Sequence, residues 1–116
     1  MSIHDDSLNN FITEITGGHW AWIGGYRTGL GQSDFAWEDG SDWNYTNWKS
    51  EQPDNLGGNG EWMREDCVHT NFNVTQTREG NGYWNDIPCD FDIVYMGYVC
   101  QKQCNDILQN QLSYDP

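Results

Sequence analysis

The stretch 82–89, which reads Gly-Tyr-Trp-Asn-Asp-Ile-Pro-Cys, restricts the fold more than any other part of the chain. It ends at Cys89, and two oxygen-bearing side chains, Asn85 and Asp86, lie in its centre. A second such group precedes Cys67 and consists of Gln52, Asp54, Glu65 and Asp66. A disulfide between Cys67 and Cys89 would bring the two groups together. Closing a loop of about 20 residues in this way stabilises a fold by on the order of 3 kcal/mol in the chain-entropy model.

The chemistry of these side chains favours a hard cation. Carboxylates and carboxamides supply the oxygens that Ca2+ prefers, and this ion takes six to eight of them. Zn2+ prefers nitrogen or sulfur, but the histidines are scattered and no two cysteines form a CxxC pair. For any one of these residues alone, an ordinary solvated loop acid is the better interpretation. The number of them around one cysteine pair favours a calcium site.

The charge balance excludes several classes of partner. The 116 residues include 18 acidic and 5 basic side chains. Nucleic acids and anionic membrane surfaces need Lys and Arg to neutralise them, so we expect neither as a partner. No apolar run is long enough for insertion into a bilayer. We expect no enzyme either, because the sequence lacks a Ser-His-Asp order and a metal-binding His motif; a carboxylate pair acting in glycoside hydrolysis is the alternative.

Hydrophobic periodicity predicts one helix and several short strands. The helix is expected over about residues 7–16, between a cap at Asp5–Ser7 and a stop at Gly17-Gly18. The expected strands are 20–26, 35–37, 67–69, 82–86 and 94–100. Residues 44–65 show no period, and such a long irregular stretch in a small domain is usually functional or disordered. Residues 103–116 have the composition of a polar tail.

Six motifs occur in an order and at spacings that resemble the C-type lectin domain. They are Trp22-Ile23-Gly24, Trp37-Glu38-Asp39-Gly40-Ser41, Tyr45-Thr46-Asn47-Trp48, Gln52-Pro53-Asp54, Glu65-Asp66-Cys67-Val68 and Trp84-Asn85-Asp86-Ile87-Pro88-Cys89. The resemblance extends to about Lys102. It implies an α+β fold in which a long calcium-binding loop lies on small antiparallel sheets, with Trp22 in a central core strand. The carbohydrate-recognition domain would span 1–102, and a C-terminal tail would span 103–116.

The resemblance also assigns the site. It implies that Cys67 pairs with Cys89 near the loop and that a cis peptide bond precedes Pro53. The calcium ligands would be Gln52, Asp54, Glu65, Asn85 and Asp86. Many members of the family form an auxiliary calcium site after the Trp-Ile-Gly strand. We do not expect one here, because Arg27 has the wrong charge for a ligand, although Asn55 and Asp66 could contribute to one.

The order Gln52-Pro53-Asp54 accompanies galactose and N-acetylgalactosamine in the family, whereas Glu-Pro-Asn accompanies mannose. The resemblance therefore implies Ca2+-dependent carbohydrate binding, in which two vicinal hydroxyls coordinate the ion and hydrogen-bond its ligands. The sugar-binding residues would be Gln52, Asp54, Glu65, Asn85 and Trp62. Galactose-type members place a stacking Trp where this chain has Leu56, so Trp62 would supply that ring. The alternative is that Trp62 anchors the loop.

The N-terminal residues resemble the second strand and second helix of the domain, so the usual first strand and first helix are missing. The cysteine that normally pairs with Cys100 belongs to that missing part. Cys104 could pair locally, pair with another chain or stay free. We therefore expect an N-terminally incomplete domain, or one that another segment completes; the alternative is a shortened variant that folds without this part.

The resemblance points to glycans, or the glycoproteins that carry them, as partners of a secreted, extracellular module. Two Asn-x-Thr sequons, at Asn44 and Asn73, suit a glycosylated chain. Oligomerisation would raise avidity, because one shallow site binds weakly. The alternative function is a protein-binding module of the same fold, with structural Ca2+ or none.

Overall fold

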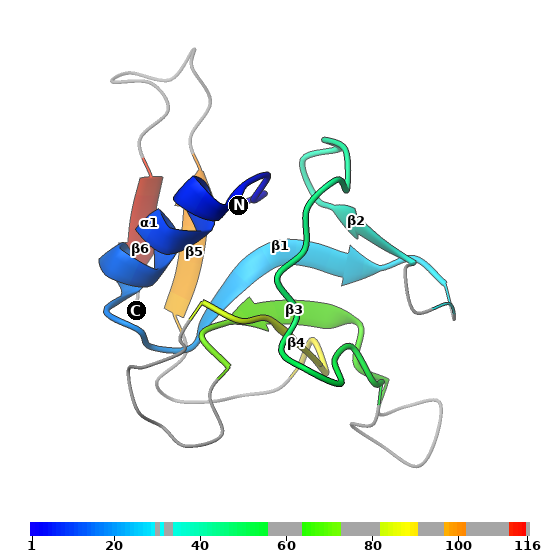
Figure 1. The fold of residues 1–116 in the computed structure, drawn as a ribbon. Helices are drawn as coiled ribbons and strands as arrows, with labels where there is room; N and C mark the ends of the chain where they lie inside the picture. The colour runs from blue at the N-terminus through cyan, green and yellow to red at the C-terminus, as the bar shows by residue number, and fades with distance from the viewer. Residues whose placement is uncertain are drawn as a thin grey trace.

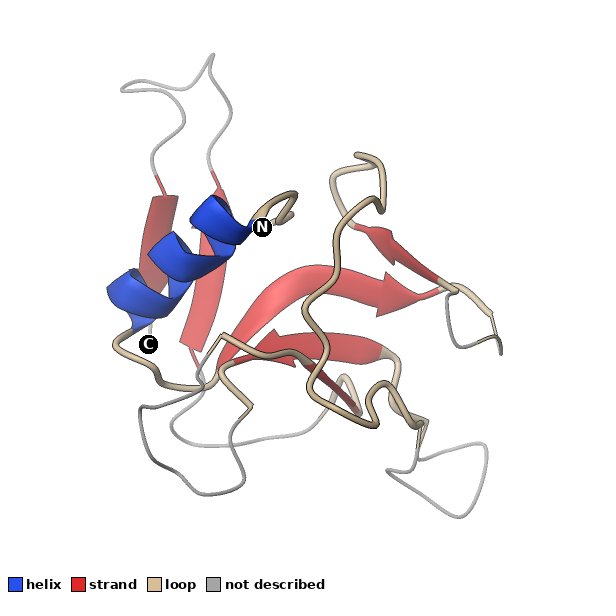
Figure 2. Ribbon diagram, viewed as in Figure 1, coloured by secondary structure: helices blue, strands red, loops and turns tan. Residues whose placement is uncertain are grey.

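The computed structural model describes residues 1–29, 31, 34–55, 64–72, 82–90, 97–101 and 112–115, of which 101 and 112–115 are described by their backbone alone. These described residues form one helix and six strands, in the order α1 (Asp6–Thr16), β1 (Ala21–Arg27), β2 (Phe35–Trp37), β3 (Cys67–Thr70), β4 (Asn85–Ile87), β5 (Gly97–Gln101) and β6 (Leu112–Asp115). Figures 1 and 2 show the helix beside β5 and β6, with the long loop after β2 crossing β1 and β3. The expected α+β fold class is confirmed.

Helix α1 forms where its capping residues predict it. The Asp5 carboxylate accepts a hydrogen bond from the Leu8 backbone N–H at 2.8 Å, which satisfies one of the free donors of the first turn. Gly17 ends the helix with a φ of 63°, and its N–H donates to the Glu14 carbonyl. A side chain would strain this left-handed conformation, so glycine is the natural residue here.

The apolar face of α1 is covered unevenly. Ile12 is fully buried in the core, Leu8 and Ile15 are half-buried against it, and Phe11 remains 43% exposed. Strand β6 contacts the helix and pairs with β5 in antiparallel register. Part of the segment that we expected to be a polar tail, residues 112–115, is therefore a strand of the sheet.

The strands form one sheet in the order β4-β3-β1-β5-β6, and β2 pairs with the C-terminal half of β1. The pairing of β1 with β5 is parallel, and the other pairings of the described strands are antiparallel. The strand expected over 82–86 begins later, at Asn85, because Gly82 adopts a φ of 99° and Trp84 forms an isolated parallel bridge with Trp48. Residues 94–96 of the last expected strand lie outside the described residues.

Strand β1 runs through the centre of the sheet and alternates between two environments. Ala21 and Ile23 are buried in the core. Trp22, which we expected in the core, is half-buried and lines a cavity of about 430 Å³ together with the Cys67–Cys89 disulfide and Cys100. The prediction for Trp22 was wrong because successive strand residues point to opposite faces.

Aromatic rings form the larger part of the core. Trp37 and Trp84 are almost fully buried, with ring centroids 5.5 Å apart in an edge-on arrangement. Trp43 and Trp48 pack against Trp84 at 5.9 and 5.8 Å. Close approach of Trp43 to β1 depends on Gly25, since a Cβ there would meet the Trp43 ring at 3.2 Å. The loop after β2 therefore supplies core side chains.

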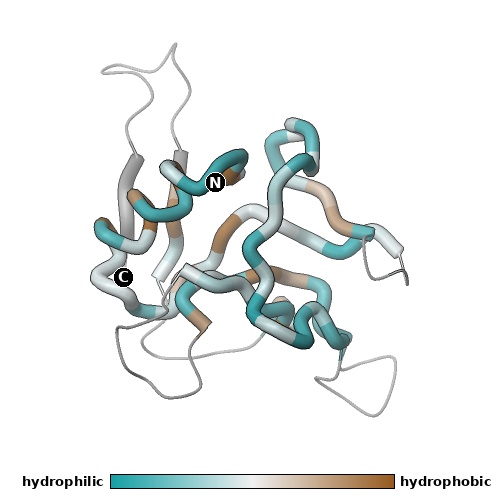
Figure 3. The backbone as a smooth tube through the Cα atoms, in the orientation of Figure 1, coloured by the Kyte–Doolittle hydropathy of each residue, from teal (hydrophilic) through white to brown (hydrophobic). Residues whose placement is uncertain are grey.

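The hydropathy of that loop does not indicate that it supplies core side chains. Figure 3 shows the backbone of residues 38–55 as neutral to hydrophilic. Tryptophan has a near-neutral hydropathy because of its indole N–H, which needs a partner when buried. The Trp84 Nε1–H donates to the Asn9 side chain of α1 at 2.9 Å. The Trp43 and Trp48 rings, which pack the loop against the core, are therefore not marked as hydrophobic on such a scale.

Two backbone hydrogen bonds fasten the loop beside β4. The Lys49 N–H donates to the Trp84 carbonyl at 2.9 Å, and the Trp84 N–H donates to the Asn47 carbonyl at 2.8 Å. This attachment places residues 52–55 next to Asn85 and Asp86. The Cys67–Cys89 disulfide joins the start of β3 to the residues after β4, so the predicted pairing is confirmed.

Candidate functional site

Three segments that are distant in sequence meet at one end of the sheet. They are residues 52–55 of the loop, residues 64–66 before β3, and strand β4. Strands β3 and β4 pair with Val68 opposite Asp86 and His69 opposite Asn85. Because the disulfide and this ladder fix both strands, the side chains at this end have defined positions.

Three carboxylates converge there. Asp54, Glu65 and Asp86 each offer one oxygen, and these three oxygens lie within 4.8 Å of one another. Glu65 and Asp86 are buried, and Asp54 is half-buried. Ca2+ binds oxygens at 2.3–2.6 Å, so two of its ligands are separated by at most about 5 Å. The spacing of this carboxylate cluster therefore fits one such ion.

Gln52 adds a buried oxygen to the carboxylate cluster. Its Nε2 donates to Asp54 Oδ2 at 3.2 Å, which couples the two residues on either side of Pro53. The Gln52–Pro53 peptide bond is cis, as the resemblance implied. Gln52 Oε1 is buried without a hydrogen-bond donor among the described residues. Buried oxygens are normally satisfied, so this atom suits a cation ligand.

Asn85 is oriented by His69. Asn85 Nδ2 lies 3.1 Å from His69 Nε2, and both side chains are buried. Burial lowers the pKa of His69 to about 4, so the ring is neutral at physiological pH and Nε2 can accept from the amide. This contact directs the amide nitrogen toward His69 and the carbonyl oxygen away from it. No sequence signal identified His69, since a lone His on a strand is usually an ordinary core residue.

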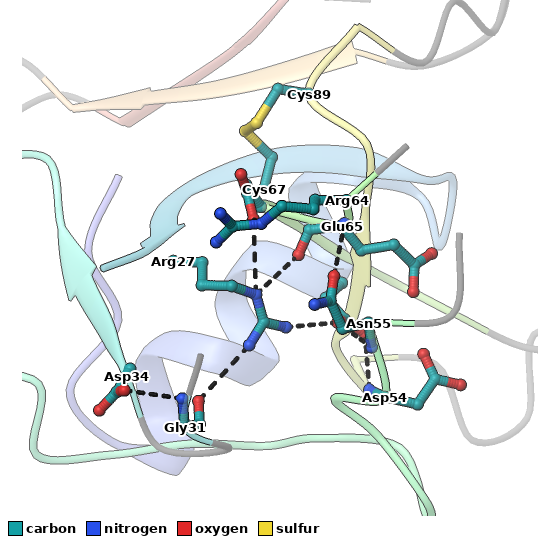
Figure 4. A network of polar contacts seen from close by, with 11 residues as sticks. Arg27, Gly31, Asp34, Asp54, Asn55, Arg64, Glu65, Cys67 and Cys89 are labelled. Carbon is teal, nitrogen blue, oxygen red and sulfur yellow. Dashed lines mark hydrogen bonds and ion pairs between the residues drawn. A yellow bond between two sulfur atoms is a disulfide. The ribbon is translucent and has the colours of Figure 1, made fainter. Parts of the chain in front are cut away.

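Asp86 accepts hydrogen bonds from Arg27, Asp54 and Asn55, three residues that Figure 4 labels. Its side chain is fully buried, and Oδ2 accepts from Arg27 Nη2 at 2.7 Å and from the Asn55 N–H at 2.8 Å. Oδ1 accepts from the Asp54 N–H at 3.1 Å. Burial raises the pKa of the Asp86 carboxyl, while the two backbone donors oppose that rise. The adjacent guanidinium also favours the ionised carboxylate.

Asn55 braces the loop against the segment before β3. Its Oδ1 accepts from the Glu65 N–H at 2.7 Å, and its own N–H reaches Asp86. Asn55 adopts a φ of 53°, a left-handed conformation that asparagine tolerates better than most residues. We considered Asn55 and Asp66 as ligands of an auxiliary site, but Asn55 bonds to protein groups and Asp66 lies near Arg27 and Arg64.

Arg27 was expected only to disfavour an auxiliary calcium site. In the structure its side chain is 2% exposed and forms an ion pair with Asp86. Its Nε donates to the Glu65 carbonyl at 3.1 Å. The guanidinium also lies 4.6 Å from the centre of the Phe35 ring. Sequence reasoning missed this role because the partners of Arg27 are 38 and 59 residues away along the chain.

The structure therefore brings Asp54, Glu65 and Asp86 together and places Gln52 in contact with Asp54. Asn85 lies next to Asp86 on β4. Trp62 and Leu56 lie outside the described residues, so the predicted stacking ring stays a prediction. Cys100 is exposed and free in the described part of the chain, and Cys104 lies outside it.

Comparison with known families decides what this fold and site represent. A family model for the lectin C-type domain matches residues 1–102. The chain belongs to the C-type lectin family.

Several known lectins are similar to this domain. A lectin of Pleurodeles waltl is 40% identical over 94 residues, which cover 77% of this chain and 48% of that protein. An alpha-N-acetylgalactosamine-specific lectin of Patiria pectinifera is 33% identical over 84 residues, which cover 72% of this chain and 42% of that protein. The crystal structure of the C-type lectin CEL-I from Cucumaria echinata superimposes with a TM-score of 0.56 at 29% identity, covering 76% of this chain and 58% of that chain.

This C-type lectin domain thus spans about half the length, or less, of the curated relatives that it matches. Domains of the family are binding modules, and the prediction that the chain is not an enzyme is confirmed. They generally bind Ca2+, and the carboxylate cluster suits that ion. The helix that the structure describes is too short to cross a membrane.

Proposed function

We propose that this domain binds carbohydrate through a Ca2+ ion held by Gln52, Asp54, Glu65, Asn85 and Asp86, with a preference for galactose or N-acetylgalactosamine. The observation that carries the proposal is the approach of three carboxylate oxygens to within 4.8 Å at the end of the sheet. The buried Gln52 oxygen and the orientation of Asn85 by His69 support it.

The residues around the cluster provide both hydrogen-bond donors and acceptors for a sugar. Bound Ca2+ would supply direct coordination to two vicinal hydroxyls. The carboxylates of Asp54 and Glu65 can accept from those hydroxyls, and the amides of Gln52 and Asn85 can donate to them. Charge-assisted hydrogen bonds are about twice as strong as neutral ones, so few contacts suffice for selectivity.

The order of amide and acid supports the preference for galactose-type sugars. Gln52 Nε2 donates to Asp54 Oδ2 at 3.2 Å, so the pair combines an amide donor with a carboxylate acceptor. Exchanging the two groups would reverse the pattern that faces a sugar. The similarity to a lectin specific for alpha-N-acetylgalactosamine also supports this choice. We assign Trp62 the stacking role on the apolar face of the sugar.

The test is retention on immobilised galactose and immobilised mannose in millimolar Ca2+, followed by a chelator wash. We expect retention on galactose and release by chelator. The double variant Gln52→Glu/Asp54→Asn should move retention to mannose. Glu14→Gln, an exposed position on α1, is the control and should behave as the wild type. Retention of the wild type on mannose alone would show that the order of amide and acid does not set specificity here.

A second candidate is a protein-binding module that needs no Ca2+. The observation that favours it is the buried ion pair between Arg27 and Asp86, which gives one of the cluster's carboxylates a cation from the chain itself. Binding to a protein ligand that continues in chelator would identify this function.

We further propose that the domain works outside the cell as a secreted module that binds glycans of glycoproteins and gains avidity by oligomerising. The Cys67–Cys89 disulfide is consistent with an oxidising compartment. Asn44 is exposed, as a glycosylated asparagine must be, and Asn73 lies outside the described residues. Mass spectrometry of the protein from a secreting eukaryotic host would test glycosylation at both positions.

A further inference from the structure

We propose that Arg27 is a built-in counter-cation of the site, which holds the binding loop in place when calcium is absent and weakens calcium binding when it is present. The inference rests on the proposed calcium site, because it concerns the same Asp86 carboxylate. It assigns to Arg27 a positioning role, since Arg27 acts through Asp86 and contacts no sugar ligand in the proposed mode.

The first observation is the burial of the ion pair. The side chains of Arg27 and Asp86 are 2% and 0% exposed, and Nη2 lies 2.7 Å from Oδ2. A charge that is removed from water needs a partner, and removing one member of a buried pair is strongly unfavourable. Among the residues that the structure describes, Arg27 is the cation that meets this need for Asp86 when no metal is bound.

The second observation is the set of segments that Arg27 connects. Its Nε donates to the Glu65 carbonyl at 3.1 Å, and its Nη1 lies 3.5 Å from the Gly31 carbonyl. Through Asp86 it also fixes the N–H groups of Asp54 and Asn55. The segments that carry Asp54 and Glu65 are therefore tied to β1 and β4 by donors of the chain itself, as Figure 4 shows.

The third observation is the way in which the two Asp86 oxygens are used. Oδ2 accepts from Arg27 and Asn55, so its two acceptor positions are filled. From the described residues, Oδ1 accepts one hydrogen bond, that of the Asp54 N–H, which leaves a second position for a metal. Arg27 and a calcium ion can thus share this carboxylate, one on each oxygen.

Sharing the carboxylate has an electrostatic cost for the metal. Two cations on one buried carboxylate repel each other, and this repulsion is stronger in the protein interior than in water. Mutual repulsion among the carboxylates of the cluster favours metal binding. The positive charge of Arg27 offsets part of that repulsion. Removing the charge should therefore tighten calcium binding while it destabilises the metal-free protein.

This role differs measurably from that of an ordinary structural arginine. A residue that only supports the fold stabilises the metal-free and metal-bound protein equally, so its removal leaves the gain in stability on adding Ca2+ unchanged. A counter-cation stabilises the metal-free protein more. Its removal should therefore enlarge the gain in stability that Ca2+ produces.

The experiment compares the wild type with Arg27→Met, which keeps the length without the charge, and Arg27→Lys, which keeps the charge. Lys49→Met removes a cation that lies over the Tyr83 ring and is the control for net charge. Thermal unfolding is followed in chelator and in rising Ca2+, and the dissociation constant for Ca2+ is measured by calorimetry.

We expect Arg27→Met to unfold at a lower temperature in chelator, to gain more from Ca2+ than the wild type, and to bind Ca2+ at least tenfold more tightly. Arg27→Lys and Lys49→Met should bind Ca2+ within about twofold of the wild type. If Arg27→Met is unfolded in chelator, circular dichroism should show that it folds on addition of Ca2+.

Each other outcome has a defined meaning. Calcium affinity of Arg27→Met equal to or weaker than that of the wild type overturns the inference and leaves the proposed function intact. Failure of Arg27→Met to fold in saturating Ca2+ overturns it as well. Calcium binding by Arg27→Met but not by the wild type supports the inference and favours the calcium-free function. No calcium binding by either overturns both proposals.

Discussion

Asp86 and Asp54 should differ sharply in what they contribute to stability, although both are proposed calcium ligands. Asp86→Asn removes the buried partner of Arg27 and replaces an acceptor with an amide donor that faces other donors. Removing one member of a buried ion pair typically costs about 3–5 kcal/mol. For a domain of this size, 1 kcal/mol corresponds to roughly 3–5 °C in the unfolding midpoint.

The perturbation to compare is Asp54→Asn, which removes the same charge from a half-buried position. Asparagine at this position can still accept from Gln52 Nε2, so we expect a loss of no more than about 1 kcal/mol. Both variants should lose calcium affinity, since each removes a carboxylate ligand.

The assay is thermal and urea unfolding in chelator, so that calcium does not contribute to either value. The Asp86→Asn midpoint should lie on the order of 10 °C or more below that of Asp54→Asn. Equal midpoints for the two variants would refute the reasoning, because they would show that the Arg27–Asp86 pair adds nothing to the metal-free fold.

Three further predictions concern stability in chelator. Replacing Cys67 and Cys89 by Ala should lower the unfolding free energy by about 3 kcal/mol, because the two cysteines are separated by 22 positions in the sequence. An unchanged urea midpoint would contradict this. Burial lowers the pKa of His69 to about 4, so the unfolded chain binds a proton at a higher pH than the folded protein does. The unfolding free energy should therefore fall by up to about 3 kcal/mol as the pH drops from 6.5 to 4. His69→Gln should lack this pH-dependent component, and parallel pH curves for the two proteins would disprove it. Trp84→Leu should cost about 3 kcal/mol, from lost ring contacts and the lost bond to Asn9, and near-ultraviolet circular dichroism would report the loosened aromatic core.

Local sequence signals predicted what is local in this structure. Helix α1 follows from Asp5, Gly17 and the spacing of apolar residues between them, and the short strands follow from β-branched and aromatic runs. The disulfide and the approach of Asp54, Glu65 and Asp86 followed from the resemblance, whose motifs carry those residues at fixed places.

Properties that depend on which face a residue occupies could not be predicted in this way. Trp22 was expected in the core, but it is half-buried and lines the cavity, whereas its neighbours Ala21 and Ile23 are buried in the core. Shifting a strand by one residue moves each side chain position to the opposite face of the sheet. The loop after β2 scored as polar because tryptophan has a near-neutral hydropathy, although the rings of Trp43 and Trp48 pack against the core.

Arg27 is the most informative of these cases, because its position in the sequence is evident but its pairing with Asp86 is not. A cation after the Trp-Ile-Gly strand disfavours a second calcium ion by the sign of its charge alone. In the fold, Arg27 lies 2.7 Å from Asp86. The residue that disfavours an auxiliary calcium site therefore also opposes binding of the proposed calcium ion. The sign of a charge can be read from sequence, but its effect on a site depends on what it faces, and here it faces the carboxylate that the proposed metal would share.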